Sequence, residues 1–224
     1  MLRPLDPSAF LESEDFYIAE FESLLTKIVC CYKMMIDNGD TVPNKEEKIR
    51  DILYNKYLND NKVCNQIGLD FDIACEPAVY INGECSGYVD LKIYSKNSLS
   101  DKSAYYIIEC KRLDNQNLKG KTGLNAKYVD DGIMRFVNGR YPTNKYLNGM
   151  IGFVVERMDI STNVTNINYV LNKYFLNANT ETVLTSLDFI KDFQYQYYSL
   201  HKGTDNKKIQ LYHLMLDFSK NVEN

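Results

Sequence analysis

The segment from Ala104 to Lys111, which reads Ala-Tyr-Tyr-Ile-Ile-Glu-Cys-Lys, constrains the fold more than any other part of the chain. Its unbroken apolar start is typical of a central β-strand that is buried on both faces. Alternate residues of a strand face the same side. We therefore expect Glu109 and Lys111 to project together, while Cys110 points the opposite way into the core.

Hydrophobic periodicity and turn dipeptides predict the elements around this strand. In order, they are a helix at 14–37, a helix at about 44–59, strands at 71–81, 87–94 and 104–111, a helix at 126–137, a strand at 149–155, a helix at about 164–176, and late strands at 193–201 and 209–218. Asn82-Gly83 predicts a hairpin between the first two strands. Because a helix precedes the strand at 149–155, a parallel crossover is its most economical connection.

Length and composition favour an α/β protein that folds as one domain over 1–224, with a core at about 44–155 and a C-terminal elaboration at about 160–224. No window approaches the roughly 18 apolar residues that span a bilayer. The N-terminus does not resemble a signal peptide, so a cytoplasmic location is expected. The six cysteines lie mostly in apolar runs and predict free, buried thiols, and their spacing predicts no structural zinc.

The charge of the chain is unevenly distributed. A net charge of -4 and a pI near 5.3 argue against a protein that coats nucleic acid non-specifically. Residues 101–145, however, contain nine Lys or Arg against five Asp or Glu. This basic stretch contains the predicted central strand and the segment that follows it.

Asp90 ends the preceding segment Gly87-Tyr-Val-Asp. If its strand pairs beside the strand of Glu109, two carboxylates and the Lys111 ammonium meet within a few ångströms. Mg²⁺ prefers hard oxygen ligands and usually takes one or two protein carboxylates. We predict a Mg²⁺ site, in which Mn²⁺ is expected to substitute, at Asp90 and Glu109 with the Cys110 carbonyl. Lys111 would orient a water molecule or stabilise developing charge, which suits phosphodiester hydrolysis.

A Glu-x-Lys tripeptide by itself is more often a surface ion pair than a catalytic pair. Here the apolar run before Glu109 implies a buried strand, where charges need partners. A third acid is expected from the helix that follows Pro43. Glu46 shares a helical face with buried residues and is the first choice, and Glu47 is the second. The alternative role for either glutamate is stabilisation of the helix N-terminus.

The motif formed by Asp90, eighteen intervening residues and Glu109-Cys-Lys resembles the PD-(D/E)XK, or restriction-endonuclease-like, nuclease superfamily. The expected order of helix, three-strand meander, crossover helix and fourth strand over 44–155 is similar to that core, with an added N-terminal helix and a C-terminal helix plus β-hairpin. The resemblance implies that Asp90 and Glu109 are metal ligands, Lys111 the motif lysine and Glu46 the acid of the first core helix. Val89 stands where the family motif has proline. Residues 127–141 also resemble a segment of bacterial restriction or defence nucleases.

Basic residues near this motif are the predicted nucleic-acid contacts. They are Arg112, Lys119, Lys121, Arg135 and Arg140. A solvated helix flank or a mobile loop is the alternative interpretation for these residues. Most of the eighteen tyrosines fall in strand-like runs and are expected to pack in the core rather than stack on bases. His201 and His213 are expected to have structural or edge roles.

The resemblance implies a Mg²⁺-dependent endonuclease that acts on DNA, related to restriction or phage defence. Two alternatives stay open. One is a catalytically silent nuclease-like domain that binds nucleic acid or another partner, and the other is an RNA-cleaving or ligand-switched member. Homodimerisation is expected only by analogy with restriction enzymes.

Overall fold

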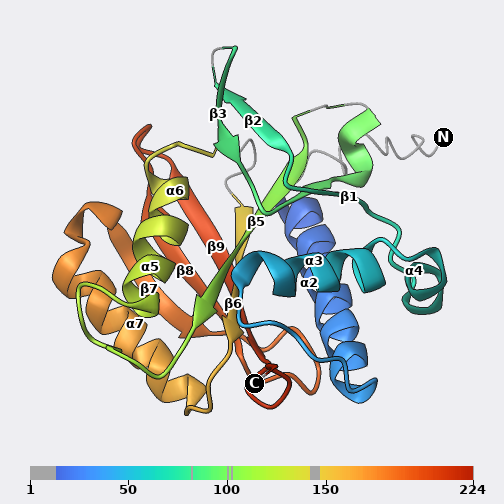
Figure 1. The fold of residues 1–224 in the computed structure, drawn as a ribbon. Helices are drawn as coiled ribbons and strands as arrows, with labels where there is room; N and C mark the ends of the chain where they lie inside the picture. The colour runs from blue at the N-terminus through green and yellow to red at the C-terminus, as the bar shows by residue number, and fades with distance from the viewer. Residues whose placement is uncertain (1–13, 82, 100, 102, 142–146, 224) are drawn as a thin grey trace.

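The computed structural model describes residues 14–81, 83–99, 101, 103–141 and 147–223. The chain has a mixed α/β fold in which helices cover both faces of a seven-stranded sheet (Figure 1). The helices are α2 (Glu14–Asp37), α3 (Glu46–Leu53), α4 (Asn61–Ile67), α5 (Leu124–Tyr128), α6 (Met134–Val137) and α7 (Ile160–Tyr174), with π-helical turns at Tyr54–Leu58 and Val129–Ile133. Short 3-10 turns lie at Lys96–Leu99 and Leu176–Ala178.

Within the described residues, nine strands form two sheets. They are β1 (Asp72–Cys75), β2 (Ala78–Ile81), β3 (Glu84–Tyr88), β4 (Leu91–Tyr94), β5 (Tyr105–Leu113), β6 (Leu147–Val154), β7 (Thr180–Ser186), β8 (Gln196–Lys202) and β9 (Lys208–Asp217). The large sheet has the order β1-β4-β5-β6-β9-β8-β7, and β2 pairs only with β3. β5, β6 and β9 run parallel to one another, and the outer strands pair antiparallel.

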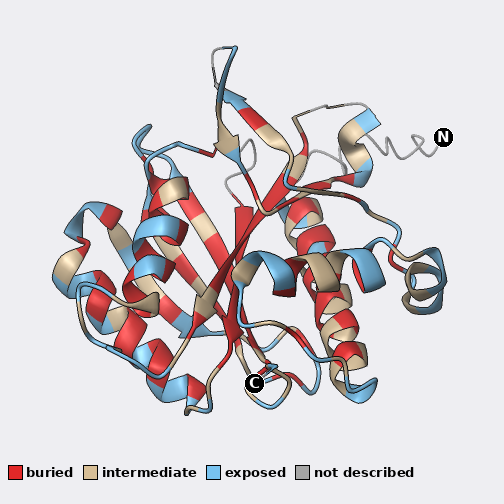
Figure 2. Ribbon diagram, in the orientation of Figure 1, coloured by how far each residue is buried: buried red, intermediate tan, exposed pale blue. Residues whose placement is uncertain are grey.

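Strand β5 lies between two hydrophobic cores, as its apolar sequence predicts. Tyr106, Ile108 and Cys110 belong to the core beneath α2 and α3, whereas Ile107 and Leu113 belong to the core beneath α5, α6 and α7. The red strands at the centre of Figure 2 show this burial on both sides. By alternation, Glu109 and Lys111 face the second side, towards the crossover formed by α5 and α6.

The predicted hairpin is right about the turn and wrong about the strands. Gly83 has φ +87 at the turn, but each predicted run is broken in two. Glu76 has φ +51 and precedes Pro77, which has no N–H for the ladder. The first run therefore divides into β1 and β2, and β4 returns to pair with β1 while β2 and β3 form a separate projecting hairpin (Figure 1).

Two elements were not predicted, α4 and β7. The polar Asn59-Asp60-Asn61 was interpreted only as the end of a helix, but the Asp60 side chain accepts from the N–H groups of Lys62 and Val63 and caps the start of α4. β7 alternates weakly between exposed and buried residues. The crossover helix, the parallel strand β6 and the late β8–β9 hairpin are confirmed, and the late hairpin joins the main sheet through β9.

The cysteines are free thiols, but the expectation that they are buried is wrong for Cys85, which is exposed on β3. Cys31 and Cys110 are buried, and the others are partly buried. Among the helices that the structure describes, none combines the length and the apolar content needed to cross a membrane.

His201 and His213 are fully buried rather than at an edge, and they form a hydrogen-bond chain through Ser199. His201 Nδ1 lies 3.1 Å from the Ala178 carbonyl, and the Ser199 hydroxyl lies 2.8 Å from Nε2 of each histidine. His213 Nδ1 lies 2.8 Å from the Tyr128 hydroxyl. A carbonyl only accepts, so the whole chain is satisfied if His201 is protonated on Nδ1 and His213 on Nε2. The chain links β8 and β9 to α5.

We expect both histidines to stay neutral in mildly acidic solution. Burial lowers the pKa of His201 to about 4. Burial also lowers the pKa of His213, and the neighbouring His201 lowers it further. Below about pH 6.5 the histidines of the unfolded chain bind protons that those of the folded chain do not. The two neutral histidines therefore cost the folded state nothing above that pH, and the free energy of unfolding declines on acidification. Long-range ¹H–¹⁵N NMR at about pH 5.5 should show the two neutral tautomers. A His201 pKa near 6.5 contradicts the assignment.

Candidate active site

Glu109 and Lys111 lie side by side on β5, as their spacing predicts. Lys111 Nζ lies 2.8 Å from Glu109 Oε1, and the two residues are 7% and 1% exposed, respectively. The ammonium also donates to the Cys110 carbonyl at 2.8 Å and to Glu46 Oε1 at 2.9 Å. The buried lysine is therefore surrounded by oxygen atoms.

Asp90 lies in the break between β3 and β4, not on a strand. The antiparallel register of β4 and β5 fixes its position. Leu91 pairs with Ile108, so Asp90, one residue earlier, lies beside Glu109, one residue later. Asp90 Oδ2 accepts from the backbone N–H of Cys110 at 2.8 Å. This hydrogen bond ties the carboxylate to the strand that carries Glu109 and Lys111.

Glu46 is the first residue of α3 and reaches β5 with both carboxylate oxygens. Oε1 pairs with Lys111, and Oε2 accepts from the backbone N–H of Arg112 at 2.9 Å. Glu47 is exposed at the rim of the same cleft. The structure thus brings Glu46, rather than Glu47, against the motif lysine.

Arg50 is a site residue that was considered only as part of the helical face of Glu46. Its guanidinium is 4% exposed, and Nη1 lies 2.6 Å from Asp90 Oδ1. Nη2 pairs with Asp51 at 2.7 Å and with Glu76 at 2.9 Å. Arg50 lies one helical turn after Glu46, so the i,i+4 spacing was the available signal.

Arg135, on the crossover helix α6, and Tyr141, which follows that helix, both bind Glu109. Arg135 Nη1 lies 2.9 Å from Glu109 Oε1 and also donates to the Tyr141 hydroxyl. That hydroxyl donates to Glu109 Oε2 at 2.7 Å. Arg135 Nε is buried and has no partner among the described residues, so this guanidinium is incompletely satisfied. Arg135 was predicted as a nucleic-acid contact, whereas Tyr141 was given no role beyond its place at the end of the segment 127–141.

Burial and the neighbouring charges shift the titration of the central pair. Burial raises the pKa of Glu109 to about 7, and the charge of Asp90 adds to this rise against the opposing effects of Lys111 and Arg135. For Lys111, burial favours the neutral amine, but the charges of Glu109, Glu46 and Asp90 outweigh it and raise the pKa. Lys111 is therefore an ammonium group at neutral pH.

The donor set fits the chemistry of Mg²⁺ in part. Asp90 and Glu109 offer hard carboxylate oxygens, and the ionised form of Glu109 is disfavoured by burial and by Asp90, which a cation would offset. The Cys110 carbonyl, the third expected ligand, accepts from Lys111, and the Cys110 side chain lies in the opposite core. Across the residues that the structure describes, no group of three or more His, Cys, Asp or Glu is arranged to hold a metal ion.

A polar cleft of about 360 Å³ adjoins Lys111 and Glu46. Its cations come from three segments of the chain and are Lys45, Lys111, Arg112, Lys127 and Arg135. Its acids are Glu46, Glu47 and Asp131. The excess of cations makes the cleft suitable for an anion, and phosphate oxygens are bound by such groups.

Of the five predicted nucleic-acid contacts, Lys119, Lys121 and Arg140 do not line this cleft. Lys119 and Lys121 are exposed in the loop after β5, where Lys119 Nζ lies 5.7 Å from the Tyr169 ring. Arg140 is exposed beside the β2–β3 hairpin, since a Cβ on Gly87 would lie 3.4 Å from its Nη2. Arg112 lines the cleft, but its guanidinium donates to Asn44.

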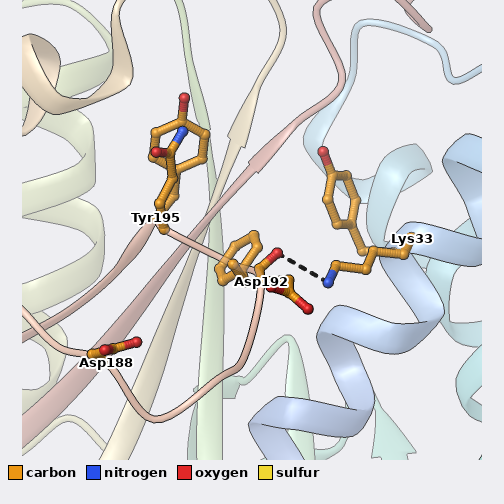
Figure 3. Close-up of a pocket in the computed structure, with 7 residues that line it drawn as sticks. Lys33, Asp188, Asp192 and Tyr195 are labelled. Atoms are coloured by element: carbon orange, nitrogen blue, oxygen red, sulfur yellow. Dashed lines mark hydrogen bonds between the residues drawn. The ribbon is translucent and has the colours of Figure 1, made fainter.

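A larger cavity of about 560 Å³ lies on the opposite face of the sheet, between α2 and the loop before β8. Figure 3 shows Lys33 donating to the Asp192 carbonyl, at 3.1 Å, while Asp188 lies apart from that pair. The charged side chains that line this larger cavity do not converge on one point. The smaller cleft is lined by Lys111 and Glu46, and Lys111 also pairs with the buried Glu109, so this cleft is the better candidate for a chemical site.

No family model, curated protein or solved structure matches this chain in the three comparisons. The likeness to a nuclease superfamily thus depends on the motif and on the order of the elements.

We expect Arg50→Met to destabilise the protein by about 2–4 kcal/mol, because it leaves Asp90 without its buried ion-pair partner. A double-mutant cycle with Asp90→Asn, measured by urea unfolding, should give a coupling of at least about 1 kcal/mol. The exposed pair Lys96–Asp70, with side chains 51% and 63% exposed, is the matched control. Lys96→Met and Asp70→Asn should couple by under about 0.5 kcal/mol. Equal coupling in the two cycles contradicts the special role of Arg50.

Proposed function

We propose that this protein is a Mg²⁺-dependent nuclease that hydrolyses phosphodiester bonds in DNA. The observation that carries the proposal is the Lys111 ammonium, which is held between Glu109 and Glu46 beside Asp90 at the edge of a basic cleft. Two carboxylates for a cation, a charged lysine and several cations for phosphate are the groups that phosphodiester hydrolysis needs.

We also propose that the fold contains a restriction-endonuclease-like core. The elements that support this are α3, the antiparallel β1, β4 and β5, the crossover through α5 and α6, and the parallel β6. The β2–β3 hairpin interrupts the proposed meander between β1 and β4, and α2 and the segment after β6 lie outside the core. A restriction or defence role is the biological context that the sequence resemblance suggests.

In the proposed mechanism, Asp90 and Glu109 would hold Mg²⁺ with help from the Cys110 carbonyl. When bound, the ion supplies a Lewis acid that polarises a phosphoryl oxygen and lowers the pKa of a bound water. Lys111 Nζ donates to the attacking water or to a non-bridging phosphate oxygen and stabilises the charge that develops there. Glu46 orients Lys111 and fixes it to the Arg112 backbone.

The cations of the cleft position the substrate. Lys45 and Lys127 are exposed on either side of the cleft, on the segment before α3 and on α5. Arg135 has an unsatisfied Nε and a lining position, so it is the guanidinium best placed to exchange its contact with Glu109 for one with phosphate. These contacts bind the backbone and carry no base specificity.

A silent, nucleic-acid-binding domain is the second candidate. It is favoured by one observation, which is that each carboxylate of the site is already paired with a cation. Arg50 pairs with Asp90, Arg135 and Lys111 pair with Glu109, and Lys111 pairs with Glu46. In this case the cleft binds phosphate but the site does not cut. An RNA substrate is the remaining alternative within the nuclease proposal.

Cleavage assays should distinguish these functions. We expect the wild-type protein with Mg²⁺ or Mn²⁺ to cut at least one of plasmid, linear duplex or single-stranded DNA, with RNA tested in parallel. Asp90→Asn and Lys111→Met should lower the rate by roughly 10²-fold or more, because each removes a group that stabilises charge in the transition state. The surface changes Asp70→Asn and Lys96→Met should cut as the wild type does. Metal-dependent cutting that persists in both site variants overturns the assignment, and binding without any cutting favours the silent domain.

Salt dependence should separate phosphate contacts from structural charges. We expect Lys127→Gln to reduce the slope of log K against log salt for duplex DNA by about 0.9, the value for one neutralised phosphate. Fluorescence anisotropy in EDTA measures this slope without cleavage. Lys33→Gln, on the opposite face of the sheet, is the control and should leave the slope unchanged. An unchanged slope for Lys127→Gln removes this residue from the interface.

A further inference from the structure

The β2–β3 hairpin projects from the sheet (Figure 1), and two of its aromatic rings are exposed. Tyr80 and Tyr88 are 63% and 64% exposed, more than any other tyrosine that the structure describes. Ala78 is paired with Tyr88, and Tyr80 lies two residues after Ala78 on β2, so the two rings share one face of the hairpin. Most tyrosines in the strands are at least partly buried, as expected from the sequence, and these two depart from that pattern.

The opposite face anchors the hairpin to the candidate active site. Val79 is buried in the core beneath α5 to α7. The Tyr141 hydroxyl donates to Glu109, and its oxygen lies 3.2 Å from the Tyr88 carbonyl. Tyr88 also precedes Asp90 by only two residues. The Tyr141 side chain therefore lies between the hairpin backbone and the site of the proposed chemistry.

The size and charge of this face restrict its occupant. Two rings beside Ala78 and Cys85 offer far less than the roughly 800 Å² per partner of a stable protein interface. Between 78 and 88 the only charged residue is Glu84, so the hairpin itself offers no cation for phosphate. Exposed tyrosine rings suit the flat face of a nucleobase, and Arg140 beside Gly87 supplies a cation for the adjoining phosphate. In a duplex the base faces are covered by neighbouring bases.

We propose that the hairpin binds unpaired nucleotides of the substrate by stacking bases on Tyr80 and Tyr88 as the strand leaves the active site. This inference rests on the proposed nuclease function and adds to it a substrate class, which is single-stranded or locally unpaired nucleic acid.

Cys85 provides a test in the unaltered protein. It lies opposite Tyr80 in the hairpin and is the exposed cysteine of the six. A saturating oligothymidylate of about 20 nucleotides, in EDTA, should slow N-ethylmaleimide alkylation of Cys85 at least about fivefold, and mass spectrometry identifies the modified cysteine. A duplex of the same length should slow it much less. An unchanged rate at saturation, or equal protection by duplex, overturns the proposal.

Paired substitutions give the second test. The double variant Tyr80→Ser/Tyr88→Ser should bind the oligothymidylate roughly tenfold or more weakly and keep its affinity for duplex, because it loses the stacking surface alone. Tyr80→Phe/Tyr88→Phe keeps the rings and should bind as the wild type does. Wild-type affinity in the serine variant overturns the hairpin proposal and leaves the nuclease proposal intact. Failure of the wild type to bind any nucleic acid overturns both.

Discussion

The burial of Glu109 and Lys111 on the central strand is the constraint on which the candidate site depends. Charges removed from water are costly unless other charges and hydrogen bonds surround them. Here the partners come from α3, from the β3–β4 break, from the crossover helix and from Tyr141. The ion pairs and hydrogen bonds to Glu109 and Lys111 tie each of these segments to the central strand. The charge network and the packing of the sheet therefore stabilise each other.

Each carboxylate of the candidate site is paired with a cation, and Arg50 also pairs with Asp51 and Glu76 outside it. The carboxylates of Glu46, Asp90 and Glu109 are matched by Lys111, Arg50 and Arg135. Burial nevertheless raises the pKa of Glu109, and Arg135 Nε has no hydrogen-bond partner among the described residues. Strained or incompletely satisfied groups within an ordered scaffold are typical of functional sites. The proposed function uses these two groups, one to hold a cation and the other to meet a phosphate.

The hairpin and the cleft divide recognition between two kinds of interaction. The cleft offers charge from Lys45, Lys127 and Arg135, which suits the phosphate backbone of any sequence. The hairpin offers aromatic surface and almost no charge, which suits bases. The Tyr141 hydroxyl contacts both the hairpin and Glu109, so this side chain connects the two surfaces.

The sequence by itself determined the central strand, the helical crossover, the parallel β6 and the pairing of Glu109 with Lys111, because these follow from local periodicity and from the alternation of side chains along a strand. It also pointed to Asp90 and Glu46, although not to the Asp90 backbone contact. Only the tertiary structure decided that β2 and β3 leave the sheet, that Arg50 and Arg135 neutralise the carboxylates, and that Tyr80 and Tyr88 are exposed while His201 and His213 are buried. The physical reason is that partners distant in sequence are chosen by strand register and by the energetic need to pair buried charge, neither of which a local pattern encodes.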